Sequence, residues 1–89
     1  MSKTINNTIV WSKTPCPFCV QAKQLLTRQG IEFEERNISN GDWTKEQLLE
    51  AVPNARTVPQ IFLEGRLIGG YDQLKLYFEN IEKEKNGSN

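Results

Sequence analysis

Two cysteines, Cys16 and Cys19, are the residues of this sequence best suited to chemistry. They are separated only by Pro17 and Phe18, a spacing at which two thiols can close a small disulfide ring and open it again. Closing so short a loop constrains the unfolded chain very little, so a disulfide here would add little to stability. We therefore interpret the pair as a two-electron redox centre and not as a structural cross-link.

The same spacing is also found in half of a four-ligand zinc site, and two cysteines can simply be buried together. The chain has no histidine and no second cysteine pair, so zinc would need two carboxylate ligands, an uncommon set. The absence of histidine also excludes Cys–His proteases and any histidine general base. These counts favour the redox interpretation, and no metal site is predicted.

The composition indicates one small domain with no preference for charged polymers. Its 89 residues can bury one core, and eleven basic residues balance eleven acidic ones. We therefore predict no nucleic-acid or membrane partner. The N-terminal residues lack the apolar run of a signal peptide, and no stretch is apolar enough to cross a bilayer. The expected compartment is the reducing cytoplasm, where paired cysteines are usually catalytic or metal-binding.

Hydrophobic patterning predicts a strand, a helix and a second strand around the two cysteines. Residues 8–11 are mostly apolar and β-branched, as in a buried strand. A helix is expected over residues 17–29, because Pro17 suits the first position of a helix and Gly30 suits its end. Residues 31–36 alternate weakly between apolar and charged side chains, which indicates the second strand.

A second helix and a hairpin are predicted next. Thr44 and Gln47 have the spacing of a capping box, so a helix is expected from there to about residue 52. Residues 59–63 and 66–68 then read as two strands joined by the two-residue turn Glu64-Gly65. Because a hairpin is antiparallel and a βαβ unit is parallel, the sheet should be mixed.

A last helix completes the predicted fold, with Asp72 expected to cap it. The result is a single α/β domain over residues 1–89, a four-stranded mixed sheet flanked by three helices on both faces. Its core should cover about residues 4–82, with residues 83–89 as a frayed tail. The apolar stripe expected to hold the last helix on the sheet is Leu74, Tyr77, Phe78 and Ile81.

The predicted elements give the two cysteines different roles. Cys16 falls at the N-cap of the first helix, where unpaired N–H groups and the helix dipole favour a thiolate. Lys13 could add a positive charge beside it, although most lysines are simply solvated. Both effects lower the pKa of a thiol, and the thiolate is the attacking species. Cys16 is therefore the expected nucleophile and Cys19, on the apolar face one turn later, the resolving thiol, with Pro17 fixing the turn between them.

Three segments resemble the glutaredoxin family, dithiol members of the thioredoxin superfamily. They are residues 13–19 (KTPCPFC), which look like the active-site segment, 56–62 (RTVPQIF) and 68–72 (IGGYD). They occur in the family's order, and the resemblance covers about residues 4–82. It implies the thioredoxin-like fold with a cis Pro59 beside the cysteines. Physical reasoning alone would also allow a trans proline at a sheet edge.

The resemblance further implies a groove for glutathione. Val58 would pair through its backbone with the cysteinyl unit, and Lys13, helped by Arg56, would meet the glycine carboxylate. The N-terminus of the last helix would receive the γ-glutamyl carboxylate, and Asp72 could balance the ammonium or only cap its helix. The glutathione-binding residues implied in this way are Lys13, Thr57, Val58, Gly70, Tyr71 and Asp72, with Phe18 and Pro59 supporting the cysteines.

The sequence also departs from the family pattern. Phe18 replaces the usual tyrosine, which removes a hydroxyl but keeps an aromatic wall. Gln73 stands where many relatives carry a second acidic residue, which would weaken the grip on the ammonium. Pro15 should stiffen the loop before Cys16. A polar contact to glutathione from the second helix could come from Glu46 or Gln47, and the sequence does not choose between them.

The expected function is glutathione-dependent thiol–disulfide exchange. Cys16 would attack protein disulfides or glutathione mixed disulfides and Cys19 would resolve the intermediate, with glutathione as co-substrate and no tightly bound cofactor. Clients would be disulfide or glutathionylated proteins, with ribonucleotide reductase one option by family resemblance, and the chain is expected to be a monomer. The alternatives are a redoxin recharged by thioredoxin reductase and a [2Fe–2S] carrier, which Pro17 disfavours by stiffening the turn.

Overall fold

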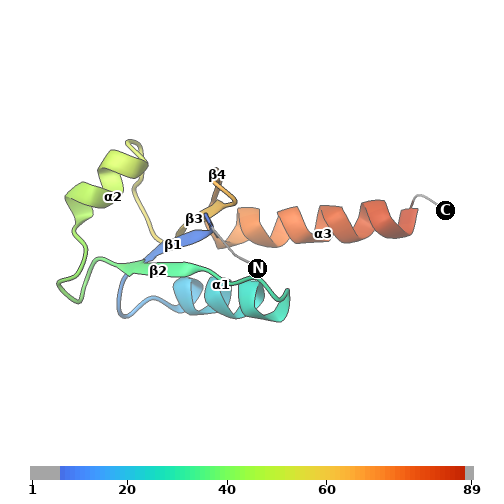
Figure 1. Cartoon of the computed structure of the whole chain (residues 1–89), viewed down its shortest axis with the longest axis horizontal. Helices are drawn as coiled ribbons and strands as arrows, with labels where there is room; N and C mark the ends of the chain where they lie inside the picture. The colour runs from blue at the N-terminus through green and yellow to red at the C-terminus, as the bar shows by residue number, and fades with distance from the viewer. Residues whose placement is uncertain (1–6, 88–89) are drawn as a thin grey trace.

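The computed structural model describes the backbone of residues 7–87 and the side chains of residues 7–81. Strands and helices follow one another in the predicted order (Figure 1). The predicted start of the core at residue 4 lies outside the described residues. In the described part of the chain, no helix has the length and apolar character needed to cross a membrane. The elements are β1 (Ile9–Ser12), α1 (Pro17–Arg28), β2 (Glu34–Asn37), α2 (Lys45–Ala51), β3 (Gln60–Leu63), β4 (Arg66–Gly69) and α3 (Tyr71–Gly87).

The strands form one mixed sheet in the order β2-β1-β3-β4. β1 runs parallel to β2 and antiparallel to β3, and β4 runs antiparallel to β3. This confirms the predicted combination of a βαβ unit with a hairpin. β1 is therefore an inner strand, and the loop that leaves its carboxyl end leads directly to Cys16.

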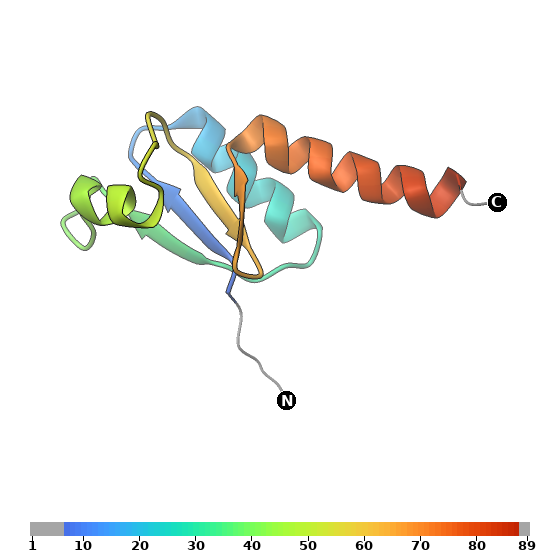
Figure 2. The same cartoon turned by 90° about the horizontal axis from the view of Figure 1, so that it is seen from above.

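The helices cover both faces of the sheet, as predicted. Successive residues of a strand face opposite sides, so Val10 and Trp11 belong to different cores. Val10 packs in the core formed with α1 and α3, which lie side by side in Figure 2, whereas Trp11 packs against α2. The first core contains Val10, Ala22, Leu26, Ile61, Leu63, Leu74 and Phe78, and the second contains Trp11, Leu48 and Val52.

The end of α1 explains why β2 begins later than predicted. Gly30 has a φ of 76° and donates its N–H to Thr27 O, while Ile31 donates to Leu26 O, both at 3.0 Å. This pair of bonds is a Schellman motif, which needs the left-handed conformation that glycine adopts freely. Because Ile31 is used to end the helix, the predicted strand over residues 31–36 is wrong at its start, and β2 begins at Glu34.

The predicted capping box and hairpin turn are both present. Gln47 N donates to Thr44 Oγ1 at 3.1 Å, and Thr44 N donates to Gln47 Oε1 at 2.9 Å, so α2 begins where the sequence indicates. In the hairpin, Glu64 has a φ of 52° and Gly65 a φ of 84°. Positive φ at both turn residues matches the twist of the flanking strands.

The start and end of α3 correct two predictions. Asp72 does not cap this helix: Gly70 O accepts the first helical bond, from Leu74 N, and Gly70 N donates to Gln73 Oε1 at 3.0 Å. Gly70 is therefore the N-cap, and Asp72 lies in the first turn. The helix continues to Gly87, so residues 83–87 of the predicted tail are helical, because glutamate and lysine are good helix formers. Residues 88–89 of that tail lie outside the described residues.

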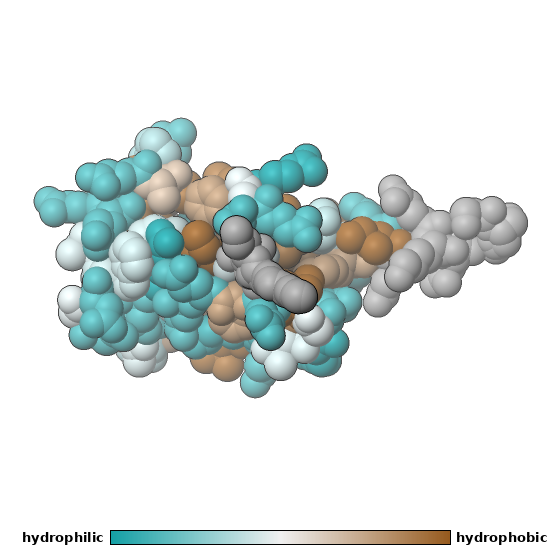
Figure 3. All heavy atoms as spheres, viewed as in Figure 1, coloured by the Kyte–Doolittle hydropathy of each residue, from teal (hydrophilic) through white to brown (hydrophobic). Residues whose placement is uncertain are grey.

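Hydrophobic surface remains along α3 where the helix extends beyond the sheet. Figure 3 shows hydrophobic residues at the surface over this helix. Of the predicted apolar stripe, Leu74 and Phe78 are buried, whereas Tyr77 is exposed. The sheet therefore covers only part of the helix, because α3 is longer than the core beneath it.

The capping box gives a direct test of what holds α2. Replacing Thr44 with alanine removes the acceptor for Gln47 N and should lower the free energy of unfolding by about 1 kcal/mol. Urea denaturation of the two proteins would measure it. Thr44→Ser, which keeps the hydroxyl, is the control and should stay close to the wild type. An equal loss in both variants would show that the cap does not stabilise α2.

Candidate active site

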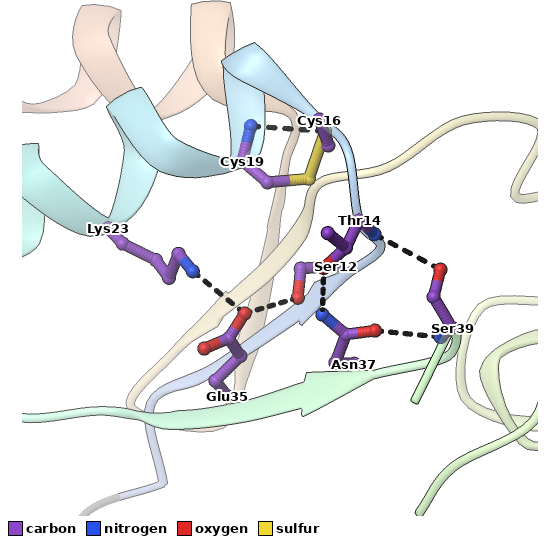
Figure 4. Close-up of polar contacts among 8 residues, drawn as sticks. All are labelled: Ser12, Thr14, Cys16, Cys19, Lys23, Glu35, Asn37 and Ser39. Atoms are coloured by element: carbon purple, nitrogen blue, oxygen red, sulfur yellow. Dashed lines mark hydrogen bonds and ion pairs between the residues drawn. A yellow bond between two sulfur atoms is a disulfide. The ribbon is translucent and has the colours of Figure 1, made fainter. Parts of the chain in front are cut away.

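The two cysteines lie at the junction of the loop after β1 with α1, joined by a disulfide (Figure 4). Cys16 is the N-cap residue, with extended backbone angles, and Pro17 occupies the first helical position as predicted. Cys16 Sγ accepts a hydrogen bond from Cys19 N at 3.2 Å. A backbone N–H at the positive end of the helix therefore points at the sulfur, which is the arrangement that stabilises a thiolate after reduction.

The two sulfurs differ in their access to solvent. Cys16 retains 9% of its surface exposed and Cys19 only 1%. Cys19 faces the sheet side of α1 together with Ala22 and Leu26, which are also buried. An approaching molecule therefore meets Cys16 first, as the sequence analysis predicts, and Cys19 can be reached only through its neighbour.

Pro59 lies beside the cysteines, as predicted, and the Val58–Pro59 peptide bond is cis. Val58 O is 3.8 Å from Cys16 Sγ, so the backbone of residue 58 borders the reactive sulfur. A sulfur within a disulfide has no proton to donate, so this is a contact and not a hydrogen bond. Residues 57–59 therefore form the wall opposite the N-terminus of α1.

The loop before Cys16 contains a second cis bond, Thr14–Pro15, which the sequence analysis did not predict. The loop is anchored by hydrogen bonds at Thr14 to the last residue of β2 and to the segment that follows it. Asn37 Nδ2 donates to Thr14 Oγ1 at 2.8 Å, and Thr14 N donates to Ser39 Oγ at 3.0 Å. Side chains distant in sequence thus hold the backbone that leads to Cys16 (Figure 4).

A cavity of about 310 Å³ opens beside the cysteines on the side of α3. The rings of Phe18 and Tyr71 stack across part of it, with centroids 6.2 Å apart. Asp72 lies at the same end, in the first turn of α3. Gln73 stands where many relatives are expected to carry a second acidic residue. Its side-chain oxygen accepts a hydrogen bond from Gly70 N. The lining residues are Phe18, Thr57, Val58, Pro59, Gly70, Tyr71, Asp72 and Gln73.

A second cavity, of about 220 Å³, continues from the first on the side of α2. The two share Thr57 and Val58, so together they form one groove that passes Cys16 along residues 57–59; we call it the active-site groove. Lys13 and Arg56 line this end, as predicted. The remaining lining residues are Ile38, Lys45, Leu48 and Ala55.

Lys45 is the groove residue that the sequence analysis missed. It is the first residue of α2, directly after the N-cap Thr44, and its side chain lines the α2 end of the groove. Its neighbours Glu46 and Gln47 are the two candidates that the sequence offers for a polar contact to glutathione from α2. Neither lines the groove, and the carboxamide of Gln47 is bound to Thr44 N. A cation at the start of a helix opposes the helix dipole, which is the signal that could have pointed to Lys45.

A polar network lies below the disulfide and was also missed. Ser12 is fully buried and donates from Oγ to Glu35 Oε2 at 2.6 Å, while Lys23 Nζ is 2.8 Å from the same oxygen (Figure 4). Burial raises the pKa of Glu35, but the hydrogen bonds from Lys23 and Ser12 and the charge of Lys23 outweigh it, so the pKa lies below its ordinary value. The network therefore ties α1 to β1 and β2 through an ionised carboxylate.

A larger hollow of about 630 Å³ runs along α1, lined by Val20, Lys23, Gln24, Thr27 and Arg28. It contains neither cysteine, and all its lining residues come from one helix. Each of the two cavities of the active-site groove is smaller, but their shared residue Val58 has its carbonyl oxygen 3.8 Å from Cys16 Sγ, and their side chains come from several separate segments. The active-site groove is therefore the candidate site.

Comparisons with known proteins agree with this geometry. The glutaredoxin family model matches residues 8–68. The chain belongs to the glutaredoxin family. Glutaredoxin 1 of Rickettsia prowazekii is 37% identical over 86 residues, which cover 94% of this chain and 86% of the relative. The family and its cysteine pair support thiol–disulfide oxidoreductase activity.

Two further comparisons concern a solved structure and a longer relative of this glutaredoxin. A buckwheat glutaredoxin solved as a complex with glutathione has a TM-score of 0.64 and 33% identity, with 92% of this chain and 71% of that chain covered. The likeness confirms the thioredoxin-like fold. A hybrid peroxiredoxin of Haemophilus influenzae is 45% identical over 69 residues, which cover 78% of this chain. The chain spans only 28% of the length of that relative.

The position of Cys16 predicts its ionisation in the reduced protein. We expect its pKa to lie well below the value of about 8.5 for a free thiol, because Cys19 N and the N-terminus of α1 stabilise the thiolate. Alkylation rates by iodoacetamide, measured against pH with the modified residue identified by mass spectrometry, would show the inflection. The Cys16→Ser variant reports the buried Cys19 alone and should react slowly. An inflection for Cys16 near the free value would contradict the activation by α1.

Proposed function

We propose that this glutaredoxin is a glutathione-dependent thiol–disulfide oxidoreductase, with Cys16 as the nucleophile and Cys19 as the resolving thiol. The observation that carries the proposal is the contrast between the two sulfurs. Cys16 caps a helix and lies 3.8 Å from the carbonyl oxygen of Val58, which lines the groove, whereas Cys19 is almost completely buried. No tightly bound cofactor is needed, and the proposed setting is the glutathione-rich cytoplasm with the protein acting as a monomer.

Two routes follow for the exchange. With a protein disulfide, the Cys16 thiolate bonds to one client sulfur and releases the other as a thiolate. Cys19 then gives up its proton and attacks Cys16 Sγ, which releases the reduced client and forms the Cys16–Cys19 disulfide. Two glutathione molecules reduce this disulfide and leave as one molecule of oxidised glutathione. With a glutathionylated client, the Cys16 thiolate bonds to the glutathione sulfur and releases the client as a thiolate. A second glutathione thiolate then attacks that glutathione sulfur, which releases the Cys16 thiolate and forms oxidised glutathione, so Cys19 is not required.

The lining of the active-site groove supports the proposed pose of glutathione. The backbone of Val58, beside Cys16, would pair with the cysteinyl unit, and Lys13 and Arg56 would face the glycine carboxylate. At the α3 end, Thr57, Gly70, Tyr71 and Asp72 would surround the γ-glutamyl group. Lys45 joins the proposed contacts to the carboxylate end. Gln73 is uncharged and so cannot balance the ammonium, and its side-chain oxygen already accepts from Gly70 N.

The two cysteine variants test these roles. In the hydroxyethyl disulfide assay coupled to glutathione, glutathione reductase and NADPH, Cys16→Ser should lose all activity because no nucleophile remains. Cys19→Ser should keep turnover of glutathione mixed disulfides but lose reduction of protein disulfides. Equal loss in the two variants would overturn the assigned roles. A folded wild-type protein that is inactive with glutathione but active with thioredoxin reductase would overturn the glutathione dependence.

A peroxiredoxin is the protein client that a specific observation favours. The hybrid peroxiredoxin contains a segment 45% identical to this chain, so in that relative a domain of this kind belongs to a peroxide-reducing polypeptide. A peroxiredoxin cysteine oxidised to sulfenic acid condenses with a thiol, and glutathione would give a mixed disulfide and water. We propose that Cys16 removes the glutathione from a separate peroxiredoxin in the same way as from any glutathionylated client.

Peroxide turnover would test this client. A peroxiredoxin from the same organism, mixed with glutathione, glutathione reductase and NADPH, should consume hydrogen peroxide only slowly until this protein is added. Cys19→Ser should support the reaction and Cys16→Ser should not, because only the monothiol route is needed. No acceleration by a wild-type protein that is active on hydroxyethyl disulfide would exclude the peroxiredoxin while leaving the proposed activity intact.

A further inference from the structure

The two ends of the active-site groove differ in chemistry. At the α2 end, Lys13, Lys45 and Arg56 line a single cavity of about 220 Å³, although they come from three separate segments of the chain. All three side chains are exposed. The ion pairs among the described side chains, Lys23–Glu35 and Arg36–Glu34, leave these three cations without a carboxylate partner. These three cations can therefore bind a negatively charged group of a ligand at this end of the groove.

The α3 end is aromatic instead. Phe18 and Tyr71 stack with an angle of 28° between their rings, and 56% of Phe18 is exposed. Binding is favourable when another apolar side chain covers such an exposed aromatic surface, because apolar area is then removed from water. The charged side chain at this end is Asp72, which would repel an acidic residue. The groove is thus positive at one end, and apolar with a negative side chain at the other.

The backbone between the two ends of the groove determines the direction in which an extended client peptide would bind. Residues 56–59 run from the cationic end to the aromatic end. Within the described residues, no backbone hydrogen bond uses the N–H or C=O of Val58, so both are available to an extended peptide. Antiparallel pairing is the more stable arrangement per residue. In this arrangement the residues before the client cysteine lie at the aromatic end of the groove, and the residues after it lie at the cationic end.

We propose that the protein selects client segments with an aromatic or large apolar residue just before the reactive cysteine and an acidic residue just after it. The inference rests on the proposed function and concerns the dithiol route, in which a client sulfur bonds to Cys16 and the client occupies the groove. On the glutathione route the groove holds glutathione, so the same preference does not arise there.

Matched peptides test the preference. The forward peptide is acetyl-Ala-Trp-Cys-Glu-Ala-amide, the reversed one exchanges Trp and Glu, and the neutral one has Gln for Glu. For each, the equilibrium between its mixed disulfide with Cys16 and the glutathione adduct is measured in the Cys19→Ser variant. The peptide's own exchange with free glutathione is subtracted, which removes differences in thiol pKa.

The forward peptide should be favoured over the reversed and the neutral peptides. Exposed ion pairs contribute about 0.2–1 kcal/mol each, so each cation should add up to about a five-fold preference for glutamate over glutamine. The preference should shrink in 0.5 M salt, because salt screens exposed charges. Lys45→Gln should reduce it, whereas Lys75→Gln, an exposed lysine of α3 outside the groove, should leave it unchanged.

Two results would overturn the proposal: equal or stronger binding of the reversed peptide, or a preference that neither salt nor Lys45→Gln changes. If Cys19→Ser does not fold, initial rates of the wild type on the three peptides as disulfide-linked dimers give the same comparison. A failure of the proposed function looks different, since hydroxyethyl disulfide would then not be turned over. Turnover of hydroxyethyl disulfide without peptide discrimination would reject only this inference.

Discussion

The approach of the N-terminus of α1 to the backbone of residues 57–59 is the constraint on which the rest of the site depends. It brings Cys16 Sγ to 3.8 Å from Val58 O while Cys19 N donates to the same sulfur. One sulfur therefore has a helix N-terminus on one side and the exposed backbone of a loop on the other. The same approach leaves Cys19 against the sheet, where solvent cannot reach it. Activation, access and burial thus follow from one packing relationship.

The sheet makes this relationship possible because β1 is an inner strand. α1 leaves from the carboxyl end of β1, and residues 57–59 lead into β3, which pairs directly with β1. The opposing helices then complete the groove from both faces, with α2 supplying Lys45 and α3 supplying Tyr71 and Asp72. A groove with two chemically different ends arises because α2 and α3 cover opposite faces.

Polar contacts hold this arrangement in place under the disulfide. Glu35 joins Ser12 of β1 to Lys23 of α1, and Asn37 holds the loop at Thr14. Exposed ion pairs add little stability by themselves. The value of these contacts is positional, because they connect β2 to β1, to α1 and to the loop before Cys16.

The sequence by itself determined most of the local structure. The capping box of Thr44 and Gln47, the stop at Gly30 and the turn at Glu64-Gly65 depend on residues a few positions apart, so their spacing was enough to place them. The N-cap position of Cys16 and the burial of Cys19 followed from the same local periodicity. The family resemblance added the cis Pro59 and most of the groove residues.

Tertiary structure decided what depends on contacts between distant segments. Lys45 joins the groove only because α2 packs over Trp11, and the partners of Glu35 come from β1 and α1, so no local pattern contains either feature. The cap of α3 is different, because it depends on a local contact, Gly70 N to Gln73 Oε1, and the sequence fits a cap at Gly70 and a cap at Asp72 equally well. The charge difference between the two ends of the groove again depends on distant segments, since it exists only once three separate cations meet.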